Sequence, residues 1–167
     1  SVDLLTAEKK GIKVSYTPDA PAPAVSELTI GIMLTLLRSI HIANSKMHNG
    51  EWYRFFGRRL SNVTIGIIGV GRIGVAIIKY LQGFGVPNIL ANDISDRPHE
   101  LNLPIQWADK EQIFKEADII TLHLPLLDST RNLFDRERIS TMKSTARIIN
   151  VARGGIINEY DLAKALN

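Results

Sequence analysis

Short runs of branched apolar residues alternate along the chain with stretches of helical spacing. The runs predict buried strands at residues 65–68, 89–92, 105–107, 119–123 and 147–151. Helices are predicted after Gly74, at 109–117, at 135–142 and after Asn158, whose side chain is suited to cap the last of them. This order is typical of an α/β fold in which helices cover both faces of a parallel sheet.

The N-terminal third shows a different pattern. Residues 12–16 predict a short strand, and the prolines of 17–23 mark a boundary. Over residues 24–49 apolar side chains recur on more than one helical stripe, which predicts one long helix buried on two sides and ended by Gly50 in a left-handed conformation. We therefore expect a remnant of a second domain at residues 1–20 and a main domain at 21–167. The main domain stops inside a helical pattern and is expected to be truncated at its C-terminal end.

Composition narrows the class of protein. The chain has 167 residues, of which 45% are hydrophobic, a formal net charge of +3 and no cysteine. The length and the hydrophobic content are enough for one good core. The lack of cysteine excludes disulfides and thiolate chemistry, so we expect a cytoplasmic protein without a metal site. The longest apolar stretch, 28–37, falls short of the roughly 20 apolar residues of a membrane span, and no membrane partner is expected. Basic and aromatic residues interleave at 54–59, where we expect a solvated link with two buried rings and no nucleic-acid site.

A glycine pattern gives the first indication of chemistry. The segment 64–74 reads TIGIIGVGRIG, so its glycines lie where a buried strand turns into a helix. Gly69 permits the tight turn, Gly71 lets the backbone approach a pyrophosphate, and Gly74 allows close packing of helix on strand. The helix N-terminus then directs its N–H groups and the positive end of its dipole at the phosphates.

An acidic residue completes this pattern. Asp93 ends the next apolar run, nineteen residues after Gly74, where a carboxylate can accept hydrogen bonds from both ribose hydroxyls of NAD. A 2′-phosphate would meet a like charge there, which favours NAD over NADP, although Arg97 nearby keeps NADP open. The combined context predicts a dinucleotide site in a Rossmann-type, doubly wound parallel sheet.

With these elements in place, the sequence resembles the D-isomer-specific 2-hydroxyacid dehydrogenase family, which includes D-lactate, D-glycerate and phosphoglycerate dehydrogenases. The resemblance covers nearly the whole chain, and its most specific segment is the Asn-Val-Ala-Arg-Gly-Gly of residues 150–155. Further matches lie in 2–18, 25–52, the 66–74 fingerprint and 123–131. Asp19 departs from the family's usual glycine after a Thr-Pro pair.

The resemblance implies an NAD-dependent oxidoreductase that moves hydride to or from a 2-oxo acid. It makes Arg153 the catalytic arginine, because a guanidinium stays charged and can hold a carboxylate with two parallel hydrogen bonds. Leu124, Thr130 and Val151 are also compatible with ordinary core or turn positions. The cofactor-binding residues, from the fingerprint and the resemblance together, are Gly69, Gly71, Arg72, Ile73, Gly74, Asp93, His123, Leu124, Pro125, Thr130, Val151, Ala152 and Arg153.

Several expectations about the parent protein follow from the same resemblance. The family's proton-transferring histidine and its glutamate have no counterpart in these residues, so we expect the fragment to bind NAD(H) with little or no turnover. The substrate is a small 2-hydroxy or 2-oxo acid, with phosphoglycerate, glycerate or hydroxypyruvate, and lactate all open. The long apolar helix suggests a homodimer. The alternative is an NAD-sensing corepressor module of the same architecture, which measurable turnover by a longer protein would exclude.

Overall fold

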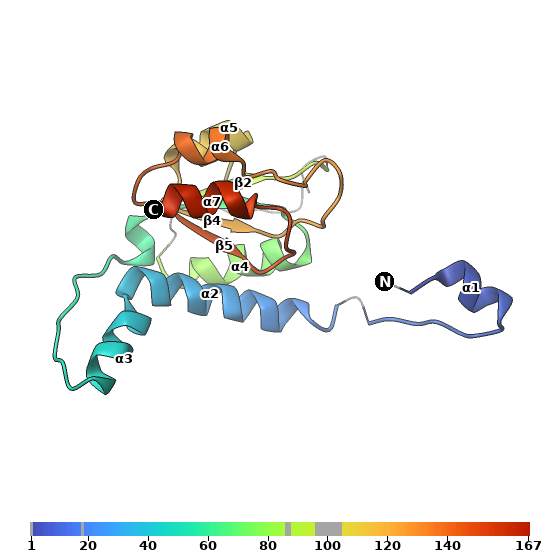
Figure 1. Ribbon diagram of the computed structural model, residues 1–167, viewed down its shortest axis with the longest axis horizontal. Helices are drawn as coiled ribbons and strands as arrows, with labels where there is room; N and C mark the ends of the chain where they lie inside the picture. The colour runs from blue at the N-terminus through green and yellow to red at the C-terminus, as the bar shows by residue number, and fades with distance from the viewer. Residues whose placement is uncertain (1, 18, 86–87, 96–104) are drawn as a thin grey trace.

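The computed structural model describes residues 2–17, 19–85, 88–95 and 105–167, and it contains a five-stranded parallel sheet (Figure 1). The strands lie in the order β3-β2-β1-β4-β5. Each runs parallel to its neighbour, with β1 in the middle. Their bounds are β1 Thr64–Ile68, β2 Asn88–Asn92, β3 Gln106–Trp107, β4 Ile119–Leu122 and β5 Arg147–Asn150. The predicted strands of the main domain are confirmed to within one or two residues.

Helices cover both faces of this sheet, so the doubly wound architecture is also confirmed. On one face lie α2 (Ala22–Arg38) and α4 (Arg72–Gln82), whose buried side chains share one apolar cluster with β1. The other face carries α5 (Lys110–Glu116), α6 (Arg136–Thr141) and α7 (Glu159–Leu166), which pack around a second cluster. Residues 65–68 and all of β4 are buried, which explains their unbroken apolar sequence.

Side-chain caps fix where three of these helices begin. The carboxylate of Asp109 accepts the backbone N–H of Gln112 at 2.7 Å, and Asp135 starts α6 in the same way. Asn158, the expected cap, accepts the N–H of Asp161 at 3.2 Å. Each cap satisfies a donor that the first turn of a helix leaves free.

The N-terminal third differs from expectation. The predicted long helix is two helices, α2 and α3 (Ile40–His48), because Ser39 takes the left-handed conformation with φ 52°. Residues 12–16 belong to no strand, and two short elements were not predicted, α1 (Leu4–Lys9) and the 3-10 helix η1 (Leu60–Asn62). Gly50 does have the expected positive φ, 75°.

Burial in this region is one-sided. The buried residues of α2 form a single stripe that ends at Leu37, and α3 buries none of its side chains. Phe56, expected to be buried, is 100% exposed. The segment around α1 extends away from the sheet (Figure 1).

Within the described residues no single helix is long and apolar enough to cross a membrane, and the pair α2–α3, which together reach that length, is bent by 66°.

A buried carboxylate anchors the amino-terminal edge of the sheet. Asp118 is 7% exposed and accepts the N–H of Thr64 at 2.8 Å. It also pairs with Arg58 at 3.0 Å and with Lys143 at 3.2 Å. Burial raises the pKa of Asp118, but the Thr64 N–H and the two cations outweigh burial and hold the pKa below its ordinary value. Arg58, from the basic and aromatic segment, thus has a structural role.

Candidate dinucleotide site

The predicted site residues gather at the carboxyl edge of the sheet. The glycine loop follows β1, Asp93 follows β2, His123 follows β4, and Val151 follows β5. Because the strands are parallel, these four segments leave the same edge. The chain order reverses between β1 and β4, and ligands of open α/β sheets bind at such a point.

Two of the three fingerprint glycines are required by the protein's own packing. Gly69 has φ 97°, and a Cβ there would lie 2.5 Å from the carbonyl oxygen of His123. A Cβ on Gly74 would lie 2.3 Å from the carbonyl oxygen of Gly69. Backbone atoms cannot swing aside, so these two positions exclude a side chain.

Gly71 is different, since a Cβ built on it meets nothing within 4 Å. The space in front of it forms part of a hollow of about 220 Å³, lined by Pro21, Ala22, Gly71, Arg72, Ile73, Gly74 and His123. Val75 donates to the carbonyl of Gly71 at 2.9 Å in the first turn of α4, so the N–H groups of residues 72–74 have no partner within the helix. Open space beside N–H donors that the helix itself leaves free, together with the helix dipole, fits the diphosphate of a dinucleotide.

Asp93 joins the end of β2 to the glycine loop. One carboxylate oxygen accepts the Val70 N–H at 2.6 Å, and the other accepts the N–H and the hydroxyl of Ser95 at 2.9 and 2.7 Å. Burial raises the pKa of Asp93, but the Ser95 and Val70 donors outweigh it and hold the pKa below the ordinary value, so Asp93 is ionised near neutral pH. The oxygen bonded to Val70 keeps capacity for another donor, and a second ribose hydroxyl would take the place of the rotatable Ser95 hydroxyl on the other oxygen.

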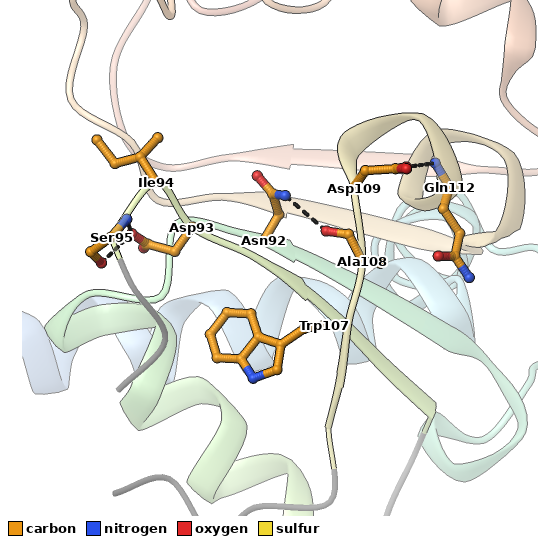
Figure 2. Close-up of a pocket in the computed structure, with 8 residues that line it drawn as sticks. All are labelled: Asn92, Asp93, Ile94, Ser95, Trp107, Ala108, Asp109 and Gln112. Carbon is orange, nitrogen blue, oxygen red and sulfur yellow. Dashed lines mark hydrogen bonds between the residues drawn. The ribbon is translucent and has the colours of Figure 1, made fainter. Parts of the chain in front are cut away.

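A second hollow, of about 490 Å³, lies beside Asp93 (Figure 2). Figure 2 shows the Asp93 side chain directed at Ser95 and the Asn92 amide directed at Ala108, whose carbonyl it donates to at 2.8 Å. The lining residues are Asn92, Asp93, Ile94, Ser95, Trp107, Ala108, Asp109 and Gln112. The carboxylates of Asp93 and Asp109 give this hollow negative charge, which disfavours the extra 2′-phosphate of NADP.

His123 lines the hollow beside Gly71 in a neutral form. Its Nε2 lies 2.9 Å from the hydroxyl of Thr121, a residue with no exposed surface. Burial lowers the pKa of His123 to about 4. Its Nδ1 is buried and has no hydrogen-bond partner among the described residues. A histidine that stays uncharged at neutral pH can contact a cofactor but is a poor proton donor.

The segment after His123 is shaped by its own hydrogen bonds. The Thr130 hydroxyl donates to the carbonyl of Pro125 at 2.6 Å and accepts the Leu127 N–H at 2.8 Å. Leu124 packs against the second apolar cluster and borders the space at Gly69, while Pro125 is exposed. Thr130 therefore forms a turn here, and its predicted cofactor contact stays a prediction.

Arg153 lies in a tight turn after β5. The Asn150 side chain brackets this turn, accepting the Ala152 N–H at 3.1 Å and donating to the Arg153 carbonyl at 2.8 Å. The loop is joined to the 130–134 segment by the bond from Asn132 N–H to the Gly155 carbonyl at 2.8 Å. The exposed Arg153 guanidinium donates to the Ala152 carbonyl at 2.7 Å. The Asn-Val-Ala-Arg-Gly-Gly segment at 150–155 thus forms a backbone turn that presents an arginine.

The structure brings only part of the predicted set into one hollow. Gly71, Arg72, Ile73, Gly74 and His123 share it, Asp93 lines the second, and Gly69, Leu124, Pro125, Thr130, Val151, Ala152 and Arg153 line neither. Arg97 lies outside the described residues. Sequence reasoning missed the bond from Val70 to Asp93 and the place of Pro21 at the glycine loop; the Asp-x-Ser spacing at 93–95 could have indicated the Ser95 contact.

Comparison with known proteins identifies the fold's relatives. The sequence model described as "D-isomer specific 2-hydroxyacid dehydrogenase, NAD binding domain" matches residues 30–167. Hydroxypyruvate reductase of Thermotoga maritima is 42% identical over 97% of this chain and 53% of its own length. D-3-phosphoglycerate dehydrogenase of Methanocaldococcus jannaschii is 42% identical over 99% of this chain and 32% of its own. The chain thus spans about half or less of the length of these relatives.

A solved structure agrees with this assignment. The crystal structure of D-lactate dehydrogenase with NAD⁺ from Lactobacillus jensenii superimposes with a TM-score of 0.86 at 33% identity, covering 99% of this chain and 50% of that one. The family match covers most of the chain, including the glycine loop, Asp93 and Arg153. The chain therefore belongs to the D-isomer-specific 2-hydroxyacid dehydrogenase family and comprises its NAD-binding domain.

Proposed function

We propose that this chain is the cofactor domain of an NAD-dependent oxidoreductase that acts on the CH–OH group of a small D-2-hydroxy acid. The observation that carries the proposal is the open space at Gly71 beside the N–H groups of Arg72, Ile73 and Gly74, which have no partner within the helix. Bound NAD(H) would supply the hydride acceptor or donor. The names of the relatives, a hydroxypyruvate reductase and a phosphoglycerate dehydrogenase, support a small 2-oxo acid as the substrate class.

Each part of the chain then has a task in binding and orientation. The glycine loop and the N-terminus of α4 hold the diphosphate, and Asp93 accepts the adenine-side ribose hydroxyls. Arg153, at the end of β5, holds the substrate carboxylate or keto oxygen and polarises the reacting carbonyl. His123, Leu124, Pro125, Thr130, Val151 and Ala152 border the cofactor along the same edge of the sheet.

A calorimetric comparison of NADH with NADPH tests the cofactor assignment. We expect the wild-type protein to bind NADH at least about tenfold more tightly than NADPH, because a 2′-phosphate near the ionised Asp93 costs roughly 1.4 kcal/mol or more. Asp93→Asn should weaken NADH binding and shrink that preference. An unchanged preference in the variant would show that Asp93 does not select the cofactor.

We propose further that these 167 residues bind NAD(H) without turning over a 2-oxo acid. The family resemblance requires a histidine paired with a glutamate for proton transfer, and His123, held neutral by burial, is not suited to that role. Reduction of pyruvate, hydroxypyruvate or glyoxylate by the purified chain, at a rate that depends on NADH, would refute this proposal.

We infer that the exposed apolar surface of α3 and the segment after it is covered by a second copy of the chain. This surface consists of Ile40, Ile42, Met47, Trp52 and Phe56, which are 42% to 100% exposed. Helix α3 projects from the α2 side of the sheet (Figure 1), and exposed apolar patches of this kind mark interaction sites. A homodimer would supply the second buried side that the sequence predicts for this region.

Sedimentation velocity tests the dimer. Met47→Asp should convert the dimer to monomers, since it places a charge inside the apolar contact. Tyr160→Asp is the matched control. Tyr160 is a large side chain exposed to a similar extent as Met47, and it lies on α7, on the other face of the sheet. A wild-type protein that sediments as a monomer at high concentration would refute the dimer.

We also propose that residues 1–20 belong to the substrate domain and 21–167 to the cofactor domain. The extension of residues 2–17 away from the sheet supports this division, as does a family match that begins at residue 30. The cysteine-free composition supports a cytoplasmic location. Limited proteolysis should cut first between α1 and α2, and a first cut inside the sheet would contradict the boundary.

A further inference from the structure

An ion pair links the N-terminal segment to the glycine loop. The Nε of Arg72, the first residue of α4, lies 2.6 Å from the Oδ1 of Asp19. Both side chains are largely exposed, with 65% of Arg72 and 74% of Asp19 accessible. Asp19 precedes α2 by three residues, so the contact joins two segments that are more than fifty residues apart in the sequence.

The surroundings place this ion pair at the edge of the hollow in front of Gly71. Pro21 and Ala22, just after Asp19, line that hollow together with Arg72. The Ser26 hydroxyl, which has no exposed surface, donates to the Ala22 carbonyl at 2.7 Å and lies 3.4 Å from the carbonyl oxygen of Ile73. The start of α2 is therefore held against the first turn of α4.

The chemistry of the guanidinium gives this contact a consequence. Asp19 contacts Arg72 at Nε, and the terminal nitrogens Nη1 and Nη2 make no bond among the described residues. These two nitrogens form the edge that binds phosphate oxygens with two parallel hydrogen bonds. A free arginine loses much rotamer freedom when it binds a ligand, whereas one already held at Nε loses less.

We propose that Asp19 is a positioning residue of the cofactor site, which holds Arg72 so that its terminal nitrogens meet the diphosphate of the bound dinucleotide. This inference rests on the proposed function, because it requires a dinucleotide in front of Gly71. Asp19 carries the same charge sign as a diphosphate, so its removal has two opposite effects, loss of orientation and relief of repulsion. We expect the loss of orientation to be the larger effect.

A double-mutant cycle on NADH binding separates these effects. Kd is measured by NADH fluorescence for the wild type, Asp19→Ala, Arg72→Gln and the double variant, with thermal unfolding to check that each is folded. Asp19→Ala should weaken binding about two- to fivefold, the range measured for exposed ion pairs. In the Arg72→Gln background Asp19→Ala should no longer weaken binding, because the orienting effect acts through Arg72, and the relief of repulsion that remains should tighten binding slightly.

Glu27→Gln is the matched control, since Glu27 is an exposed carboxylate of α2 outside the ion pairs of the described residues, and it should bind NADH like the wild type. Tighter or unchanged NADH binding by Asp19→Ala would overturn the proposal, as would an equal loss in the Arg72→Gln background. If the wild type itself fails to bind NADH, the proposed cofactor site is overturned together with this inference. If the wild type binds and Asp19→Ala alone behaves contrary to expectation, only this inference is lost.

Discussion

Replacing Gly71 and Gly74 by alanine, one at a time, separates two roles of the glycine loop. At Gly74 the new methyl carbon would lie 2.3 Å from the carbonyl oxygen of Gly69, a backbone atom that cannot rotate away. Overpacking of this kind costs about 1–3 kcal/mol. Because alanine gains about 0.5–1 kcal/mol over glycine within a helix, we expect a net destabilisation of about 1–2 kcal/mol.

At Gly71 the same change should leave the fold almost untouched. Nothing lies within 4 Å of the new carbon, and φ −78° with ψ −159° is extended backbone that any residue adopts. The loss of a good N-cap residue and the gain from a less flexible unfolded chain nearly cancel, so the free energy of unfolding should change by less than about 0.5 kcal/mol. The methyl group does enter the space assigned to the diphosphate, and NADH binding should weaken at least about tenfold.

Two measurements on the same three proteins check this pair. Urea unfolding gives the free energy of unfolding, and NADH fluorescence titration gives the Kd. The expected pattern is a stable Gly71→Ala that binds poorly and a destabilised Gly74→Ala. A Gly71→Ala protein that binds NADH as tightly as the wild type would refute the reasoning that the open space serves a ligand.

Three further predictions concern stability and catalysis. Asp118→Asn should lower the free energy of unfolding by about 2 kcal/mol at neutral pH, because charge-assisted hydrogen bonds are lost. Folding lowers the pKa of Asp118, so the difference in stability from the wild type should shrink as the pH falls below 3.8. A difference that does not change with pH would contradict the role of the carboxylate. Ser39→Gly should stabilise the fold by about 0.5 kcal/mol. The relief of left-handed backbone strain, roughly 1–2 kcal/mol, exceeds the cost of a more flexible unfolded chain, roughly 0.4–1 kcal/mol. Thermal unfolding measures the change, and a clear loss of stability would contradict the prediction. In a polypeptide that also carries the substrate domain, Arg153→Gln should lower kcat/KM for 2-oxo acids by about a hundredfold or more with NADH affinity unchanged. Steady-state kinetics measures this change, and activity that persists in the variant would contradict the assignment of Arg153 as the catalytic arginine.

The main domain was predictable because its elements carry strong local signals. Strand β1 and strand β4 are buried along nearly all of their length, so their sequences are unbroken apolar runs. The glycine loop is a local motif whose spacing fixes its backbone path, and Gly69 and Gly74 have the contacts that the motif predicts. Caps such as Asn158 act within one turn and are equally visible in sequence.

The parts that were not predictable depend on contacts between distant residues or on a single dihedral angle. The break at Ser39 interrupts an apolar pattern that continues on both sides, and serine is not a residue that marks a left-handed position. The pairs Asp19–Arg72 and Arg58–Asp118 join segments that meet only in the folded chain. The role of the Thr130 hydroxyl in a turn likewise follows from geometry.

Mapping NADH binding onto individual backbone amides tests the central claim most directly. A proton–nitrogen correlation spectrum of the isotope-labelled chain is recorded during titration with NADH. The largest shifts should fall on the amides of Gly71, Arg72, Ile73 and Asp93, because they border the two hollows at the carboxyl edge of the sheet. Thr64, bonded to Asp118 at the opposite edge, should not shift. An absence of shifts, or shifts confined to regions away from the glycine loop, would contradict the account.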